Sequence, residues 1–346
     1  MKEQVEDLLK LAFETNASDL HITVGAPPIV RINGSLKQYG KEALTPSETE
    51  AMARALIPEK HWDDFVERGE YDFSYGIPGV SRFRLNVYRQ RSCISFVARV
   101  IPTKVPSLED LQMPAVLQTL AEKPQGLILV TGPTGSGKST TLAAMIDYIN
   151  RNYSKHIITL EDPIEYLHKH QLSIINQREV GFDTEKFANG LRASLRQDPD
   201  IILVGEMRDL ETISTAITAA ETGHLVLATL HTSSAPQTID RIIDVFPPHQ
   251  QPQIRIQLAA TLVGIVAQRL FPAADGKGRV AATEVLVNQP SVANLIRNEK
   301  NHQIKSVMQT SRAQGMHTLE MAIKQLRDQK RISADIATQY LGDGEV

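Results

Sequence analysis

The sequence predicts an α/β fold, in which a doubly wound parallel sheet in the second half follows a small α+β domain. Three observations support this prediction. In the second half, four short apolar runs alternate with segments of helical pattern. In the first half, strand-like runs alternate apolar and polar residues, and a proline-rich segment, 101–106, separates the halves. Continuous apolar runs are typical of strands buried on both faces, so the 346-residue chain is expected to form two domains.

Residues 1–101 are expected to form the α+β domain. Two segments have helical spacing of apolar residues and four have the character of strands. In chain order these segments are 5–13, 20–24, 28–32, 46–68, 81–87 and 94–100. Asn33-Gly34 is the expected hairpin turn after the second strand. Prolines recur through residues 102–114, which are therefore expected to link the two domains.

Residues 115–346 are expected to form the parallel sheet and its covering helices. The expected strands are 127–130, 157–160, 201–204 and 225–228. Parallel strands require crossover connections, and helices are expected at 140–150, 184–196 and 211–222. Beyond Pro252 the pattern is mainly helical and ends in a charged tail of about two helices.

Composition narrows the class of protein. The formal net charge of −3 gives no general attraction to nucleic acid or anionic lipid. The single cysteine, Cys93, excludes an intramolecular disulfide and a cysteine-rich zinc module. Residues 1–10 are charged, unlike a signal peptide, and the apolar stretch 258–266 is too short to span a bilayer. A cytoplasmic protein without an integral membrane span is expected.

Residues 126–140, GLILVTGPTGSGKST, contain the full P-loop spacing, G-x-x-x-x-G-K-[ST]. Glycines let such a loop curl so that backbone N–H groups point at phosphate oxygens. Lys138 is expected to reach the β- and γ-phosphates of a nucleoside triphosphate, and the Ser139 hydroxyl to ligate Mg²⁺. The expected nucleotide contacts are Gly132, Pro133, Thr134, Gly135, Ser136, Gly137, Lys138, Ser139 and Thr140. A strand before the motif and a helix after it argue against a chance glycine-rich turn.

Reactive side chains follow each of the other three apolar strands. Glu161, Asp162 and Glu165 follow the second strand. Glu206 follows the third and His231 the fourth. Ligands bind beyond the carboxyl ends of strands in open α/β sheets, so these groups are expected to converge on one nucleotide. Glu206 is the candidate Mg²⁺ anchor, and the three carboxylates after the second strand are candidate general bases, with helix capping as the alternative for Glu161 and Asp162.

Histidines and arginines complete the set of candidates. His224 and His231 are candidate γ-phosphate sensors, with a structural role as the alternative. Phosphoryl transfer gains from additional positive charge, often supplied by another domain or subunit. The candidate arginines, for which a solvated surface position is the alternative, are Arg82, Arg84 and Arg99 in the first half and Arg192 and Arg196 in the second.

The chain resembles the secretion-ATPase superfamily of type II and type IV pilus systems, and within it the pilus retraction ATPases. Its signatures, in the family's order, are ASDLHI (17–22), GPTGSGKST (132–140), ITLEDPIEY (158–166), LRQDPDIILVGEMRDLET (195–212) and TAAETGHLVLATLHT (218–232). The last four look like the family's Walker A, Asp box, Walker B and His box. Assembly and secretion paralogues typically carry an additional N-terminal domain and a four-cysteine zinc motif. Neither occurs here, which favours retraction.

The resemblance implies roles for individual residues. Lys138 and Ser139 would bind phosphate and Mg²⁺, Glu165 would be the general base, and Glu206 would hold Mg²⁺ through water. The remaining implied site residues are His224 and His231 of the His box, Arg84 and Arg99 of the first domain, and Arg192, Arg196 and Arg241 of the motor domain. The family's C-terminal motif AIRNLIRE occurs here as VANLIRN (292–298), with Ala293 and Asn298 in place of an arginine and a glutamate.

The resemblance also implies the architecture and partners. It implies a PAS-like domain at 1–101, a linker at 102–114 and a RecA-like ATPase domain with a helical C-terminal region at 115–346. The implied assembly is a homohexamer that binds ATP and Mg²⁺ between domains. It would work on the platform protein and pilus base at the inner face of the cytoplasmic membrane, without nucleic acid.

A ring motor that hydrolyses ATP is therefore the leading hypothesis. One alternative is a nucleotide-gated assembly factor or accessory paralogue with low turnover, although such a scaffold needs no general base. Another is a P-loop nucleic-acid translocase, but no basic strip interleaved with aromatic residues supports it.

Overall fold

The structure is a computed structural model that describes residues 1–32 and 34–342. It divides the chain into two compact units. The first comprises Met1–Lys104 and Glu165–Leu167, and the second comprises Val105–Ile164 and His168–Val346. Asn33, the first residue of the expected hairpin turn, lies outside the described residues. Each unit has its own hydrophobic core and is described by itself.

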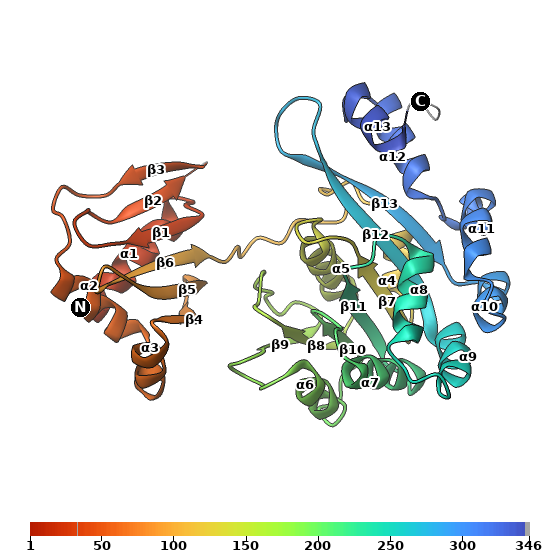
Figure 1. Ribbon diagram of the computed structural model, residues 1–346, viewed down its shortest axis with the longest axis horizontal. Coiled ribbons are helices and arrows are strands. Elements are labelled where there is room, and N and C mark those ends of the chain that lie inside the picture. The colour runs from red at the N-terminus through yellow and green to blue at the C-terminus, as the bar shows by residue number, and fades with distance from the viewer. Residues whose placement is uncertain (33, 343–346) are drawn as a thin grey trace. The chain divides into compact units, whose positions relative to one another are not determined.

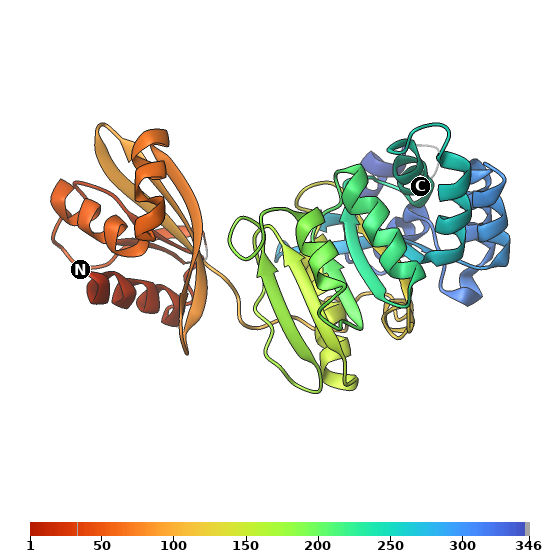
Figure 2. The same ribbon diagram turned by 90° about the horizontal axis from the view of Figure 1, so that it is seen from below.

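The first unit is an antiparallel sheet with helices packed against one face (Figures 1 and 2). Its strand order is β3-β2-β1-β6-β5-β4. Its elements are α1 (Lys2–Glu14), β1 (Asp19–Ile22), β2 (Ile29–Ile32), β3 (Ser35–Gln38), α2 (Pro46–Leu56), η1 (Glu59–His61), α3 (Trp62–Arg68), β4 (Glu70–Ile77), β5 (Ser81–Gln90) and β6 (Cys93–Val100). The alternation predicted for β5 is confirmed, because Phe83, Leu85 and Val87 are fully buried. The strand β4 was not predicted from the sequence.

The second unit is built on a seven-stranded sheet of order β13-β12-β7-β11-β10-β8-β9. Its strands are β7 (Gly126–Thr131), β8 (His156–Glu161), β9 (Ile174–Glu179), β10 (Ile201–Val204), β11 (Leu225–Leu230), β12 (Leu262–Pro272) and β13 (Arg279–Val287). Its helices are α4 (Val116–Ala121), α5 (Lys138–Asn152), α6 (Phe187–Ser194), α7 (Leu210–Glu221), α8 (Ala235–Asp244), α9 (Gln251–Thr261), α10 (Pro290–Arg297), η2 (Asn301–Gln303), α11 (Ile304–Thr310), η3 (Arg312–Gln314), α12 (Leu319–Asp328) and α13 (Ala334–Leu341).

The expected mainly helical region beyond Pro252 is wrong for residues 262–287. This stretch forms β12, parallel to β7, and β13, antiparallel to β12. Two long strands fit here because the apolar run that starts in α9 continues into residues buried on both sheet faces, such as Ile265 and Val266. Periodicity over so short an apolar run does not separate helix from buried strand.

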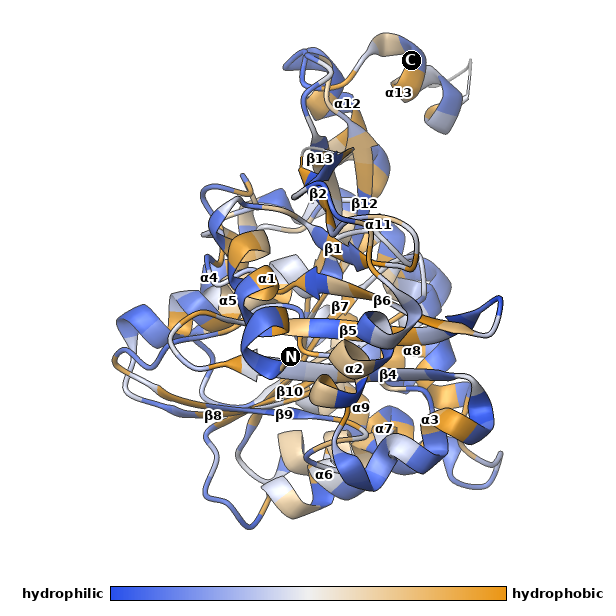
Figure 3. Cartoon of the chain, turned by 90° about the vertical axis from the view of Figure 1, so that its left-hand side faces the viewer, coloured by the Kyte–Doolittle hydropathy of each residue, from blue (hydrophilic) through white to orange (hydrophobic). Residues whose placement is uncertain are grey.

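Alternate residues of β7 explain why the parallel strands are continuously apolar. Leu127 and Leu129 pack into the core that includes α7, α8 and α9, whereas Ile128 and Val130 pack into the core that includes α4 and α5. Helices therefore cover both faces of the sheet (Figure 1). A smaller cluster joins β12 and β13 to α12, which alternates hydrophobic and hydrophilic residues (Figure 3).

No helix among the described residues is both long and apolar enough to cross a membrane.

Candidate nucleotide-binding site

The P-loop occupies the turn between β7 and α5, as its motif predicts. Gly132 has φ +141°, and a Cβ there would lie 2.3 Å from the Gln268 carbonyl oxygen and 2.6 Å from Ser136 Oγ. Gly137 has φ +88°, and its Cβ would lie 2.8 Å from Gln268 Nε2. A side chain at either position would therefore both strain the backbone and displace a neighbouring atom. The loop keeps its tight curl only with glycine at these two positions.

Polar groups of the loop fit a phosphate. Lys138 is 9% exposed, and its Nζ donates to the carbonyl oxygens of Gly132 (2.8 Å) and Pro133 (3.0 Å). Ser136 Oγ is buried and has no hydrogen-bond partner within the described part of the chain. The helix α5 begins at Lys138, so its positive end faces the same loop. A lysine curled over the loop and an unpartnered hydroxyl indicate a cradle for an anion.

Gln268 of β12 supports the P-loop and was not predicted from the sequence. Its Nε2 donates to the Ser136 carbonyl (2.7 Å), and its Oε1 accepts from Thr141 Oγ1 (2.8 Å). Gln268 is 3% exposed, so both bonds are shielded from water. The available signal was a single glutamine within an apolar run, but its partners depend on β12 lying beside β7.

A cavity of about 690 Å³ adjoins the start of α5 within the second unit. This volume lies in the range usual for small-molecule sites. The cavity continues from the P-loop toward the turn between β12 and β13, where Arg279 Nη1 lies 3.5 Å from the Gly135 carbonyl oxygen. Its lining includes Gln112, Met113, Gly137, Thr140, Leu270 and Arg279. Four of these residues, Gln112, Met113, Leu270 and Arg279, lie in segments whose proximity to the P-loop was not predicted from the sequence.

The parallel register brings the predicted strand ends to one edge of the sheet. β11 lies between β7 and β10, and β10 pairs with β8. At this edge Glu206 contacts His231, with 2.7 Å between Oε1 and Nε2. The Met207 N–H donates to the Thr229 carbonyl (3.1 Å), which fixes the turn after β10 against the end of β11. The predicted proximity of Glu206 and His231 therefore follows from strand order.

Arg208 also contacts Glu206 and was not among the predicted residues. Its Nε lies 2.5 Å from Oε1, and its Nη2 donates to Oε2 (2.6 Å). Partial burial raises the pKa of the Glu206 carboxyl, but the Arg208 hydrogen bond and the charges of His231 and Arg208 outweigh it and hold that pKa below its usual value. Glu206 is thus kept as a carboxylate.

The carboxylates after β8 occupy different settings. Glu161 Oε1 accepts from Thr159 Oγ1 (2.6 Å) and Gln177 Nε2 (3.1 Å), which gives it a structural role at the strand end. The alternative role of capping a helix is wrong for Glu161 and Asp162, because the following segment, 162–173, is not helical. Glu165 is exposed and belongs to the short segment grouped with the first unit, in which the Leu167 N–H donates to the Pro102 carbonyl (3.3 Å).

Other predicted residues of the second unit lie away from this group. His224 precedes β11, and the Gly126 N–H at the start of β7 donates to its carbonyl (3.0 Å). It therefore lies at the opposite sheet edge from the P-loop, about 20 Å away for six-residue strands. Arg192 of α6 pairs with Glu211 of α7. Arg196 and Arg241 are exposed, the former just after α6 and the latter in the last turn of α8.

Two predicted arginines of the first unit are direct cross-strand neighbours. Arg84 on β5 lies opposite Arg99 on β6, and both are exposed. On the other side of Arg99, Asp19 Oδ1 accepts from its Nε (3.0 Å), while Ser18 Oγ donates to Asp19 Oδ2 (2.7 Å). Like charges directly opposite destabilise a sheet. Among the described residues Asp19 is the carboxylate that pairs with Arg99, so the remaining positive charge of the two arginines favours an anionic ligand on this face.

Fold and site together define a P-loop nucleotide-binding protein of the RecA-like α/β class. The family model described as Type II/IV secretion system protein matches residues 1–335. The chain belongs to this family. The expected resemblance and RecA-like fold are confirmed.

Three known proteins show how similar the chain is to members of that family. The type IV pilus retraction ATPase PilT of Pseudomonas aeruginosa is 47% identical over 335 residues, which cover 97% of each chain. The type IV pilus ATPase PilU of the same organism is 45% identical over 337 residues, covering 97% of this chain and 88% of PilU. The crystal structure of the pilus retraction motor PilT with bound ADP matches with a TM-score of 0.89 and 50% identity, covering 97% of this chain and 96% of that one.

Proposed function

We propose that the chain is an ATP-hydrolysing, hexameric motor that powers retraction of type IV pili. The observation that carries the proposal is the grouping of the P-loop, Glu206 and His231 at one sheet edge, in a chain similar to a retraction ATPase over almost its whole length. ATP is the substrate, and Mg²⁺ is the implied cofactor. The partners are the platform protein and pilus base at the inner face of the cytoplasmic membrane.

Each residue at the site has a defined task. Lys138 and the backbone N–H groups of the P-loop bind the β- and γ-phosphates. Mg²⁺ usually keeps several waters and few protein ligands, which fits the Ser139 hydroxyl and a water-mediated contact to Glu206. When bound, the metal neutralises charge that develops on the phosphates. His231, in contact with Glu206, is placed to report whether that carboxylate is engaged.

Glu165 is the proposed general base, which accepts a proton from the attacking water. The structural engagement of Glu161 supports this choice among the three carboxylates. Arg84 and Arg99 are proposed to supply positive charge to the γ-phosphate when the ring brings a first domain to the nucleotide. Arg192, Arg196, Arg241 and His224 are not assigned a contact with the nucleotide within one subunit.

Steady-state phosphate release by the wild type, Lys138→Ala and Glu165→Gln tests hydrolysis. Both variants should lose most activity, and Glu165→Gln should still bind ATP because it changes only the base. A wild type no faster than Glu165→Gln would support the alternative of a nucleotide-gated scaffold. Stimulation of turnover by DNA would instead favour a translocase.

Deletion of the gene tests the direction of the work. Cells that carry excess pili and do not twitch are expected for a retraction motor, whereas cells without pili would contradict retraction. An accessory role is the second candidate, since the chain is 45% identical to a second type IV pilus ATPase, PilU, and 47% identical to PilT of the same organism. Restoration of twitching by this chain alone in a strain lacking all other retraction ATPases would exclude that accessory role.

A further inference from the structure

The segment 162–173 connects β8 to β9 in an unusual way. These strands are parallel neighbours, with Thr159 opposite Gln177 and Glu161 opposite Glu179. The connection must therefore return along the full length of the strands, a path that usually contains a helix. Here it contains none, although it carries Glu165. The backbone groups of this loop must find partners elsewhere.

Two side chains of β9 bind the loop on either side of Glu165. Glu179 Oε2 accepts from the Ile164 N–H (3.1 Å), and Gln177 Oε1 accepts from the His168 N–H (2.9 Å). Glu179 is only 3% exposed, so its carboxylate is a buried acceptor for a backbone amide. Gln177 Nε2 donates in turn to Glu161 Oε1, which ties the loop to the end of β8. The side chains of Gln177 and Glu179, two residues apart on β9, therefore accept hydrogen bonds from backbone N–H groups of the loop.

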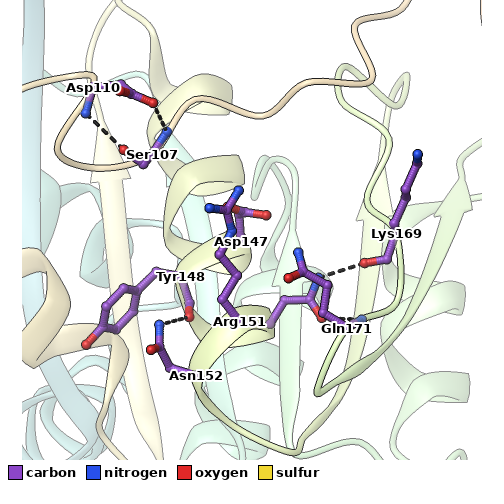
Figure 4. Close-up of polar contacts among 9 residues, drawn as sticks. Ser107, Asp110, Asp147, Tyr148, Arg151, Asn152, Lys169 and Gln171 are labelled. Carbon is purple, nitrogen blue, oxygen red and sulfur yellow. Dashed lines mark hydrogen bonds and ion pairs between the residues drawn. The ribbon is translucent and has the colours of Figure 1, made fainter.

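Asn150 binds the same loop from the P-loop helix. Its Nδ2 donates to the Lys169 carbonyl (2.7 Å), and its Oδ1 accepts from the Gln171 N–H (3.1 Å). Its own carbonyl accepts from the Leu172 N–H (3.0 Å). Asn150 is fully buried, and Lys169 and Gln171 lie beside α5 (Figure 4). The helix that begins at Lys138 therefore holds the loop at its other end.

We propose that Asn150, Gln177 and Glu179 are positioning residues for hydrolysis, which hold the loop that carries Glu165. The inference rests on the proposed role of Glu165 as general base. Bonds on both sides of Glu165 restrict the path of its backbone, and Asn150 links that path to the nucleotide-binding helix. A displacement of about 1 Å at a reacting group can reduce a rate by about 100-fold, so such bonds matter for turnover more than for binding.

The test compares Asn150→Ala and Glu179→Ala with matched controls. Each is expected to reduce kcat at least about tenfold, with ADP affinity within about twofold of wild type. Glu179→Gln should restore most of the rate, because its amide oxygen can accept the same N–H. Asn152→Ala is the control on α5, since Asn152 is exposed and its side-chain amide donates to the Tyr148 carbonyl of the same helix (Figure 4). It should behave as wild type.

Combination with Glu165→Gln separates positioning from a general structural effect. If these residues act through Glu165, then Asn150→Ala combined with Glu165→Gln is no slower than Glu165→Gln alone. Multiplied losses, or an unchanged kcat in folded Asn150→Ala, would overturn the inference. Circular dichroism verifies folding, and Gln177→Ala replaces Glu179→Ala if the latter does not fold. A Glu165→Gln variant as active as wild type would instead overturn the proposed base.

Discussion

Acidification should destabilise the second unit through His168. Burial lowers the pKa of this imidazole from 6.5 to about 4, and its Nδ1 has no hydrogen-bond partner within the described residues. The unfolded chain keeps the ordinary pKa and therefore binds the proton more readily between pH 6.5 and 4. The contribution of neutral His168 to the free energy of unfolding is fully present above pH 6.5. It is lost as the pH falls from 6.5 to 4.

The magnitude follows from the difference between the two pKa values. A difference of 1 between the folded and unfolded pKa values corresponds to about 1.4 kcal/mol. The free energy of unfolding should therefore be lower by about 3 kcal/mol once the pH is below 4. At pH 5 the unfolded imidazole is almost fully charged and the folded one mostly neutral, which gives a loss of about 2 kcal/mol. For a unit of this size the unfolding midpoint should fall by about 4–8 °C.

Scanning calorimetry of wild type and His168→Phe at pH 7 and pH 5 measures this effect. The phenylalanine keeps an apolar ring and cannot titrate. Between pH 7 and pH 5, the unfolding midpoint of His168→Phe should therefore fall by about 4–8 °C less than that of the wild type. Any constant cost of the substitution cancels in this comparison. Parallel pH dependence in the two proteins would refute the reasoning.

Three further outcomes are expected. Gly132→Ala should weaken ATP binding about tenfold more than Gly135→Ala, because a Cβ added at Gly135 would meet no atom within 4 Å. Titration calorimetry measures both affinities, and equal losses would contradict the steric argument. Gln268→Leu should leave its two buried partners, Ser136 and Thr141, unpaired and lower the free energy of unfolding by about 1–3 kcal/mol for each. Denaturant titration measures this change, and an unchanged free energy of unfolding would argue against these two bonds. Arg84→Ala and Arg99→Ala should lower kcat far more than they raise KM for ATP, whereas a change in KM alone would indicate simple binding. Mixed rings of either arginine variant with Lys138→Ala subunits should regain activity if the arginines act across subunits.

Local sequence patterns predict the parts of this protein that depend on residues near one another in the chain. The P-loop and the strands before Glu206 and His231 follow from motif spacing and short apolar runs, because a parallel sheet aligns its carboxyl ends. Gln268 was missed because its partners are fixed by β12, a strand late in the sequence that inserts beside β7. Arg208 was missed because its two-residue distance from Glu206 carries no periodic signal.

The loop after β8 shows the same limit. The acidic residues at 161–165 were recognised, but their surroundings depend on polar residues of β9, such as Gln177, that lack the alternation typical of a strand. His224 shows that residues of one sequence motif can also lie far apart in the structure. It shares a sequence motif with His231, yet the two residues flank β11 at opposite ends.

The β12–β13 ribbon has a structural consequence. Its strands pair continuously from Gly264–Val287 to Pro272–Arg279, and Gln268 lies near the middle of that ladder. Three residues beyond Gln268, Phe271 belongs to the cluster that includes α12 and α13. The ribbon therefore joins the residue that supports the P-loop to the cluster that packs the C-terminal helices, within one continuous pair of strands.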